Sequence, residues 1–77
     1  MPIMSSLIEQ KIRKELGRKI KEYRTVAHLT QDELSGKVEV TQTYLGHIEQ
    51  GIKTPSLSFL IKIASRLKIE LWELFKF

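Results

Sequence analysis

The sequence predicts an all-α domain of five helices, of which the first is the longest. Two observations lead to this prediction. In several stretches of the 77-residue chain, apolar residues recur every three or four positions, which is the spacing of one face of an α-helix. A serine or threonine stands just before most of these stretches, where its hydroxyl can accept a hydrogen bond from a free amide of the first helical turn. We expect residues 1–77 to form this one domain.

The first helix is expected to begin near Leu7, after a flexible start at residues 1–6. Ser6 and Glu9 have the spacing of a capping box, in which each side chain binds the backbone amide of the other residue. An apolar stripe then continues along the helix at Ile8, Ile12, Leu16, Ile20 and Tyr23. This spacing favours one helix face turned toward a core.

Two short helices joined by a tight turn are expected over residues 30–50. Thr30 and Glu33 form a second capping box, which predicts the start of the first of these helices. Thr41 can cap the second helix, and Gly51 can end it in the left-handed conformation that glycine adopts without strain. This arrangement is the core of a helix-turn-helix motif.

The second of these helices has one apolar face and one polar face without charges. The residues expected to face the core are Leu45, Ile48 and, just past the helix end, Ile52. The remaining positions are Gln42, Thr43, Gly46, His47 and Gln50. Surface helices usually carry lysine and glutamate on their outer face. Amide, hydroxyl and imidazole groups can instead donate and accept hydrogen bonds at base edges in a major groove, so this pattern is typical of a recognition helix.

Two more helices are expected after a loop. Pro55 disfavours helix at the residue before it, and Ser56 can cap the helix that follows. That helix carries an apolar stripe at Leu57, Leu60, Ile61, Ala64 and Leu67. A last short helix is expected at 70–75, within a C-terminal helix and tail that span residues 70–77.

Composition and charge limit the classes of function. A formal net charge of +4 is compatible with nucleic acid binding but is common among soluble domains. The chain has no cysteine, only two histidines, and neither a metal-ligand spacing nor a glycine-rich phosphate loop. We therefore expect no enzyme, cofactor or metal site. The lack of cysteine fits a reducing cytoplasm, and no stretch approaches the ~20 apolar residues that span a membrane.

Taken together, the segments resemble the Cro/lambda-repressor type of helix-turn-helix domain, also called the xenobiotic-response-element family. The resemblance covers residues 16–75 in order and without gaps, in the segments LGRKIKEYR (16–24), LTQDEL (29–34), VEVTQTYLGHIEQG (38–51), TPSLSFLIKIASRL (54–67) and LWELF (71–75). It implies a five-helix DNA-binding domain with an extended first helix. It also implies a regulator of transcription that binds double-stranded DNA as a homodimer on a pseudo-palindromic operator. Residues 7–15 exceed what the family needs, and could lie on a partner subunit, on DNA or on the core, or extend into solvent.

We expect binding to divide into reading of bases and positioning on phosphates. The expected base-reading residues are Gln42, Thr43, Gly46 and His47. The expected phosphate contacts are Gln31, Tyr44, Lys53 and Thr54. Glycine costs roughly 1 kcal/mol inside a helix, so Gly46 either admits DNA close to the backbone or is merely tolerated. His47 is either solvated or a direct contact, and in the second case its protonation would tighten binding.

The resemblance implies further contacts and one departure from the family pattern. Arg24 would pair with Glu49 and so tie the first helix to the recognition helix, and Gln31 would brace Gln42. Where the family usually has glycine at left-handed helix ends, this chain has His28, Glu39 and Lys68. Either these turns are built differently, or packing offsets the cost of about 1 kcal/mol that a non-glycine residue incurs there.

Three aromatic residues exceed the apolar set that the family commonly carries: Phe59, Trp72 and Phe77. They could enlarge the core, but exposed aromatic residues near the C-terminal helices are also what a homodimer interface requires, and we favour the interface. The alternative function is a module whose main partner is another protein. Such a module would be an antitoxin that binds a toxin, or an adaptor that uses the same fold without DNA.

Overall fold

The computed structural model describes the backbone of residues 2–77 and the side chains from Ser6 onward. Over this range it has no strand, and its helices are α1 (Pro2–Val26), α2 (Gln31–Lys37), α3 (Gln42–Glu49), α4 (Leu57–Leu67) and the 3₁₀-helix η1 (Leu71–Phe75). The structure thus has four α-helices and not the predicted five. The fifth element is a 3₁₀-helix of only five residues, whose first turn is closed by a hydrogen bond from the amide of Glu73 to the carbonyl of Glu70 at 3.0 Å. None of the helices described could cross a membrane.

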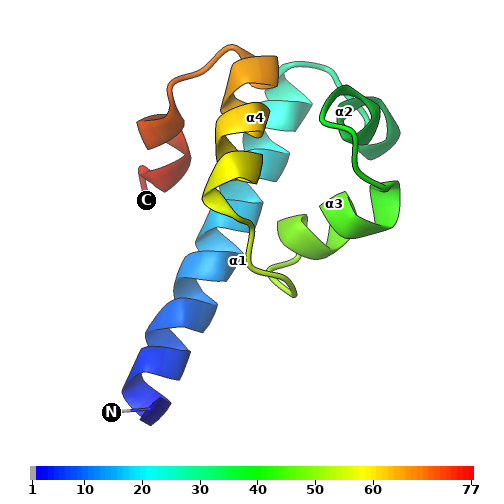
Figure 1. The fold of residues 1–77 in the computed structure, drawn as a ribbon. Coiled ribbons are helices and arrows are strands. Elements are labelled where there is room, and N and C mark those ends of the chain that lie inside the picture. The colour runs from blue at the N-terminus through cyan, green and yellow to red at the C-terminus, as the bar shows by residue number, and fades with distance from the viewer. Residues whose placement is uncertain (1) are drawn as a thin grey trace.

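Helix α1 is the longest element, and its N-terminal half stands out from the rest of the domain (Figure 1). It begins at Pro2, so residues 2–6, which we expected to be a flexible start, belong to the helix. Of the predicted apolar stripe, Leu16 and Ile20 are buried, but Ile8 and Ile12 are 53% and 40% exposed. The stripe meets the core only in the C-terminal half of α1, where other helices cover it.

The core lies between the C-terminal half of α1 and the shorter helices. In Figure 1, α2 and α3 lie to the right of α1, α4 crosses in front of it, and η1 lies to the left. Every helix contributes apolar side chains to a single cluster: Leu16, Ile20, Leu34, Val38, Leu45, Ile48, Phe59, Leu60, Ile63, Ala64, Leu67 and Leu74. The helix-turn-helix pair is therefore packed against a fixed scaffold.

The structure corrects several expectations about burial. Phe59, expected at a dimer interface, is buried because its ring packs edge-on against Tyr44, with 5.5 Å between the ring centroids. Leu57 and Ile61 were expected in the core stripe of α4 but are exposed, because they lie on the flank of the helix away from Ile63. Ile52 is exposed because α3 ends before it and the chain turns at a left-handed glycine.

The three helix ends that lack glycine are left-handed. The backbone angle φ is 60° at His28, 60° at Glu39 and 59° at Lys68, so the alternative that these turns are built differently is wrong. Each is followed by an apolar residue that packs against the core: Leu29, Val40 and Ile69. The amide of that residue donates back to the preceding helix in each case, at 3.0–3.1 Å. This is the hydrophobic contact and hydrogen bond of a Schellman-type helix end, and it offsets the backbone cost.

Glu39→Gly is expected to leave the melting temperature unchanged or to raise it, because glycine enters the left-handed region without the steric cost of a Cβ atom. The ion pair that would be lost, between Glu39 and Lys62 at 3.6 Å, is largely exposed and contributes little. Thermal unfolding followed by circular dichroism measures the change. As a control, Lys21→Gly at an exposed right-handed position of α1 should lower the free energy of unfolding by roughly 0.5–1 kcal/mol. A clear fall in melting temperature for Glu39→Gly would contradict the left-handed turn.

Candidate nucleic-acid interface

Helix α3 presents polar side chains on one exposed side. The hydroxyl of Thr41 accepts a hydrogen bond from the amide of Tyr44 at 3.1 Å, which fixes the first turn of the helix. Gln42 and Thr43 follow on this turn and are exposed, and His47 is half-buried one turn later. Together with neighbouring residues they line a shallow hollow of about 270 Å³, whose lining is Gln31, Gln42, Thr43, Gly46, His47 and Gln50. The structure thus brings the predicted base-reading residues and Gln31 to one surface.

The start of α2 is fixed beside this surface by the predicted capping box. The hydroxyl of Thr30 accepts from the amide of Glu33 at 3.0 Å, and the carboxylate of Glu33 accepts from the amide of Thr30 at 2.8 Å. The hydrogen bond from this backbone amide lowers the pKa of the Glu33 carboxyl below its ordinary value. Gln31 is the first residue of α2, so the box also sets the position from which its side chain reaches α3.

A buried carboxylate joins three helices beneath the polar surface. The side chain of Glu49, the last residue of α3, is 2% exposed. It accepts two hydrogen bonds from Arg24 of α1, at 2.7 Å and 3.0 Å, and one from the Nε2 atom of Gln31 of α2, at 2.9 Å. Arg24 also donates to the carbonyl of Leu29 at 2.8 Å. A buried charge requires partners of this kind, and here they tie α3 to both α1 and α2.

The structure also bears on the expected roles of Gln31 and Gly46. Gln31 was expected to brace Gln42, but it donates to Glu49, and no hydrogen bond joins the two glutamines in the part of the chain described. Gly46 was expected to read DNA, to admit it closely or merely to be tolerated; it is buried and lines the hollow on this side of α3. A Cβ atom there would lie 3.6 Å from the side-chain oxygen of Gln31, an ordinary contact distance. Packing within the domain therefore does not require glycine at residue 46, and the close approach of DNA to its backbone stays a prediction.

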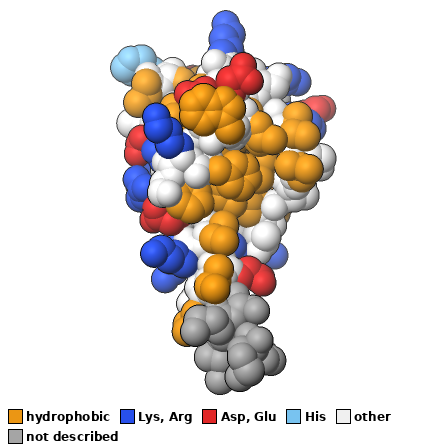
Figure 2. All heavy atoms as spheres, turned by 90° about the vertical axis from the view of Figure 1, so that its left-hand side faces the viewer, with side chains coloured by type: hydrophobic (Ala, Val, Ile, Leu, Met, Phe, Trp, Pro, Cys, Tyr) orange, Lys and Arg blue, Asp and Glu red, His pale blue; other side chains and the backbone are white. Residues whose placement is uncertain are grey.

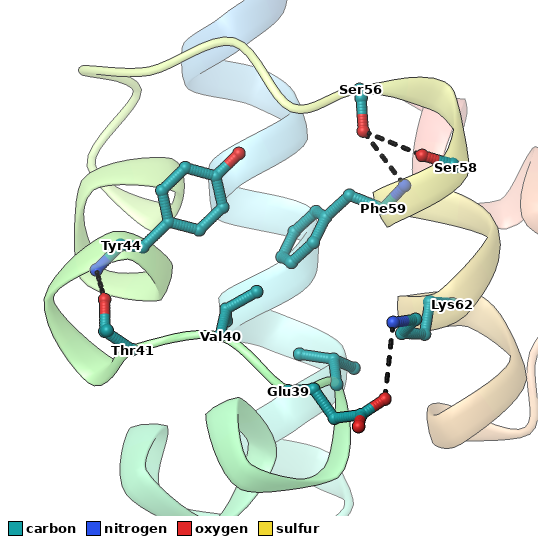
Figure 3. A pocket seen from close by; sticks show the side chains of 9 residues that line it. Glu39, Val40, Thr41, Tyr44, Ser56, Ser58, Phe59 and Lys62 are labelled. Carbon is teal, nitrogen blue, oxygen red and sulfur yellow. Dashed lines mark hydrogen bonds and ion pairs between the residues drawn. The ribbon is translucent and has the colours of Figure 1, made fainter.

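Apart from Gln31, the residues expected to contact phosphates lie in two different places. Lys53 and Thr54 are exposed in the loop after α3. Tyr44 lies on another side of α3 and lines a separate hollow of about 610 Å³ between α3 and α4. Figure 3 shows its ring and that of Phe59 turned toward each other above Val40. The ring of Tyr44 therefore packs on α4, and Lys53 and Thr54 are exposed. The phosphate contacts of all three residues stay predictions.

The ion pair between Arg24 and Glu49 was predicted and is present, but the close backbone contact between α1 and α3 at Gly17 was not predicted from the sequence. A Cβ atom on Gly17 would clash with the backbone oxygen of Ile48 and would lie 2.6 Å from that of Glu49. Only glycine lets the C-terminal end of α3 come this near to α1. Arg13 of α1 adds a hydrogen bond from its Nε atom to the carbonyl of Gly51 at 3.2 Å. The available signal was a glycine inside a strongly periodic helical stretch, which often marks close packing.

The chain is similar to proteins of one family. The sequence pattern of the family described as "Helix-turn-helix" matches residues 20–74. The HTH-type transcriptional regulator SlrR of Bacillus subtilis is 39% identical over 61 residues, which is 78% of this chain and 40% of SlrR. The chain spans only 40–64% of the length of this protein and of the next two curated relatives.

Two solved structures have a similar fold and share about a third of the aligned residues. The restriction-modification controller protein C.AhdI of Aeromonas hydrophila is 34% identical, with a TM-score of 0.78 over 80% of this chain and 94% of the other. The biofilm master regulator SinR, solved in complex with DNA, is 32% identical, with a TM-score of 0.75 over 79% and 98% of the two chains.

Glu49→Leu is expected to lower the free energy of unfolding by about 3–5 kcal/mol, because the Arg24 guanidinium would keep its buried position without a counter-charge. Urea unfolding followed by circular dichroism measures the loss. In the double variant Arg24→Met/Glu49→Leu neither charge remains, so its loss should be smaller than the sum of the two single losses. Strict additivity of the single losses would contradict the coupling seen in the structure.

Proposed function

Because this chain belongs to the helix-turn-helix family, of the Cro/lambda-repressor type, we propose that it is a regulator of transcription that binds specific sequences of double-stranded DNA. The observation that carries the proposal is the exposed, uncharged polar side of α3, which contains Gln42, Thr43 and His47. The helix is held by a buried ion pair, so these side chains start from fixed backbone positions. Relatives named as transcriptional regulators, and SinR solved with DNA, support the same function.

The proposed roles follow from the hydrogen-bonding groups of each side chain. Gln42 can bind adenine through two hydrogen bonds, and Thr43 can bond to a base edge or contact the methyl group of thymine. His47 would lie one turn further along the groove. Lys53 and Thr54 in the loop after α3 would bind backbone phosphates, which positions the domain without reading sequence. The side-chain amide of Gln31 has two N–H groups. One donates to Glu49, and the other can donate to a phosphate.

We further propose that the protein acts as a homodimer on a pseudo-palindromic operator. One recognition helix reads only a few base pairs, and two related copies read half-sites about 34 Å apart. Hydrophobic side chains gather on one face of the molecule (Figure 2). The exposed large apolar residues of α4, of η1 and of the tail after it are Leu57, Ile61, Trp72, Phe75 and Phe77. This set, called the α4–η1 face below, retains Trp72 and Phe77 from the expected interface and replaces the buried Phe59.

The DNA proposal predicts different effects for reading and positioning residues. Duplexes selected from a random-sequence library provide the operator. Gln42→Ala is expected to weaken binding to this operator by about 5–150-fold and to relax selection at one base position. Lys53→Ala should weaken all duplexes alike and lower the slope of log affinity against log salt by about 0.9. Lys68→Ala removes the same charge at the far end of α4 and serves as the control. Selection that yields no preferred sequence would contradict the proposal.

A second prediction concerns pH. If His47 contacts a phosphate or an acceptor on a base, operator affinity should rise as pH falls from 8 to 6, because a protonated imidazole gains a positive charge and a second donor. His47→Gln should remove this dependence, while His28, exposed at the end of α1, stays in place as an internal control. Fluorescence anisotropy with a labelled operator measures both proteins. A flat profile for the unmodified protein would contradict a direct role for His47.

A further inference from the structure

The N-terminal half of α1 presents apolar side chains that the described part of the domain leaves exposed. Leu7, Ile8 and Ile12 are 58%, 53% and 40% exposed. Residues 6–12, called the arm below, lie before the region matched by the family pattern, which begins at residue 20. The arm projects from the body of the domain (Figure 1). A helix without tertiary contacts is only marginally stable in water, and a solvated helix end would carry polar groups on every side.

The exposed apolar residues of the arm and of the α4–η1 face lie on the same side of the molecule. Figure 2 shows hydrophobic side chains that continue from the broad patch over α4 and η1 downward along α1. Ile8 and Ile12 are one helical turn apart and so form a stripe along the arm. The opposite side of this turn carries Gln10, which is also exposed. The arm is therefore amphipathic, and its apolar side extends the α4–η1 face.

The charges around the arm make DNA or an anionic membrane an unsuitable partner for this apolar stripe. The arm and the turn after it carry charges of both signs, at Glu9, Lys11, Arg13, Lys14 and Glu15. Arg13 is paired with Glu9 at 3.5 Å and also binds the carbonyl of Gly51. A helix that binds phosphates or anionic lipids would carry lysine and arginine on its polar side without such acidic neighbours.

The area of the face favours a second copy of this chain. The exposed parts of the α4–η1 side chains amount to about 500 Å², taking ~200 Å² for a large free apolar side chain, whereas a stable interface buries ~800 Å² on each partner. The exposed parts of Leu7, Ile8 and Ile12 in the arm add about 300 Å² on the same basis. Two copies related by a two-fold axis bury the same patch on both subunits. One continuous apolar face on this chain is therefore enough to form the interface.

We infer that the arm is part of the homodimer interface, and that its apolar stripe packs on the second copy together with the α4–η1 face. This inference rests on the proposed homodimer and adds the element that completes it. The arm is rigidly continuous with the segment of α1 that holds α3 through Gly17. Contacts of the arm therefore help to set the distance and angle between the two recognition helices, and with them the spacing of the half-sites.

The test compares substitutions on the two sides of the arm. Ile8→Lys is expected to raise the dimer dissociation constant by roughly tenfold or more, since it places a charge in an apolar contact. Gln10→Lys adds the same group on the opposite side and should change the constant by less than about twofold. Ile8→Ala removes apolar area while favouring helix, and should weaken the dimer even if lysine perturbs the arm. Sedimentation equilibrium measures the constants, and far-ultraviolet circular dichroism measures helix content.

Ile61→Lys in α4 separates this inference from the proposed homodimer. If Ile61→Lys weakens the dimer while Ile8→Lys and Ile8→Ala behave like Gln10→Lys, the role of the arm is overturned and the homodimer stands. If the unmodified protein is a monomer at all concentrations, both are overturned, and operator selection alone then decides the DNA-binding proposal. Weakening by Ile8→Lys, Ile8→Ala and Ile61→Lys, with Gln10→Lys unchanged, supports the arm as part of the interface.

Discussion

The position of α3 depends above all on the buried carboxylate of Glu49. Its oxygens accept hydrogen bonds from Arg24 of α1 and Gln31 of α2, and an uncompensated carboxylate at this depth would strongly destabilise the fold. The last residue of α3 can therefore occupy this place only when both neighbouring helices are in position. Because Glu49 needs both partners, α2 and α3 are held in one arrangement relative to α1. Apolar packing alone specifies such an arrangement less well.

A second constraint acts at the same end of α3. The missing side chain of Gly17 lets the backbone of Ile48 and Glu49 rest directly on α1. With its C-terminal end held on α1 by packing and by charge, α3 directs its N-terminal turn, with Gln42 and Thr43, outward. Side chains near a helix N-terminus are the ones that reach base edges in helix-turn-helix proteins. The anchor and the exposed polar turn are thus two ends of one short rigid element.

Local features of this fold were predictable, whereas features set by the relative orientation of helices were not. The capping box of Thr30 and Glu33 depends on residues three apart, and the structure contains it. Periodicity identified the apolar stripe of α4 but not which members the neighbouring helices cover, so Ile61 was assigned to the core and Phe59 to the surface. The role of Gly17 also escaped prediction, because it depends on how closely α1 and α3 approach.

The left-handed turns and the exposed apolar surface both affect the free energy of unfolding of the domain. A domain of this size has a small core and a marginal free energy of unfolding. The left-handed residues His28, Glu39 and Lys68 each add a backbone cost of about 1 kcal/mol, which the packing of the next residue offsets. Burial of the α4–η1 face and of the arm in a dimer would add stability that rises with protein concentration. The same contacts would then favour folding, dimer assembly and the pairing of two α3 helices. At low protein concentration, where the monomer predominates, the domain would be both less stable and less able to bind an operator of two half-sites.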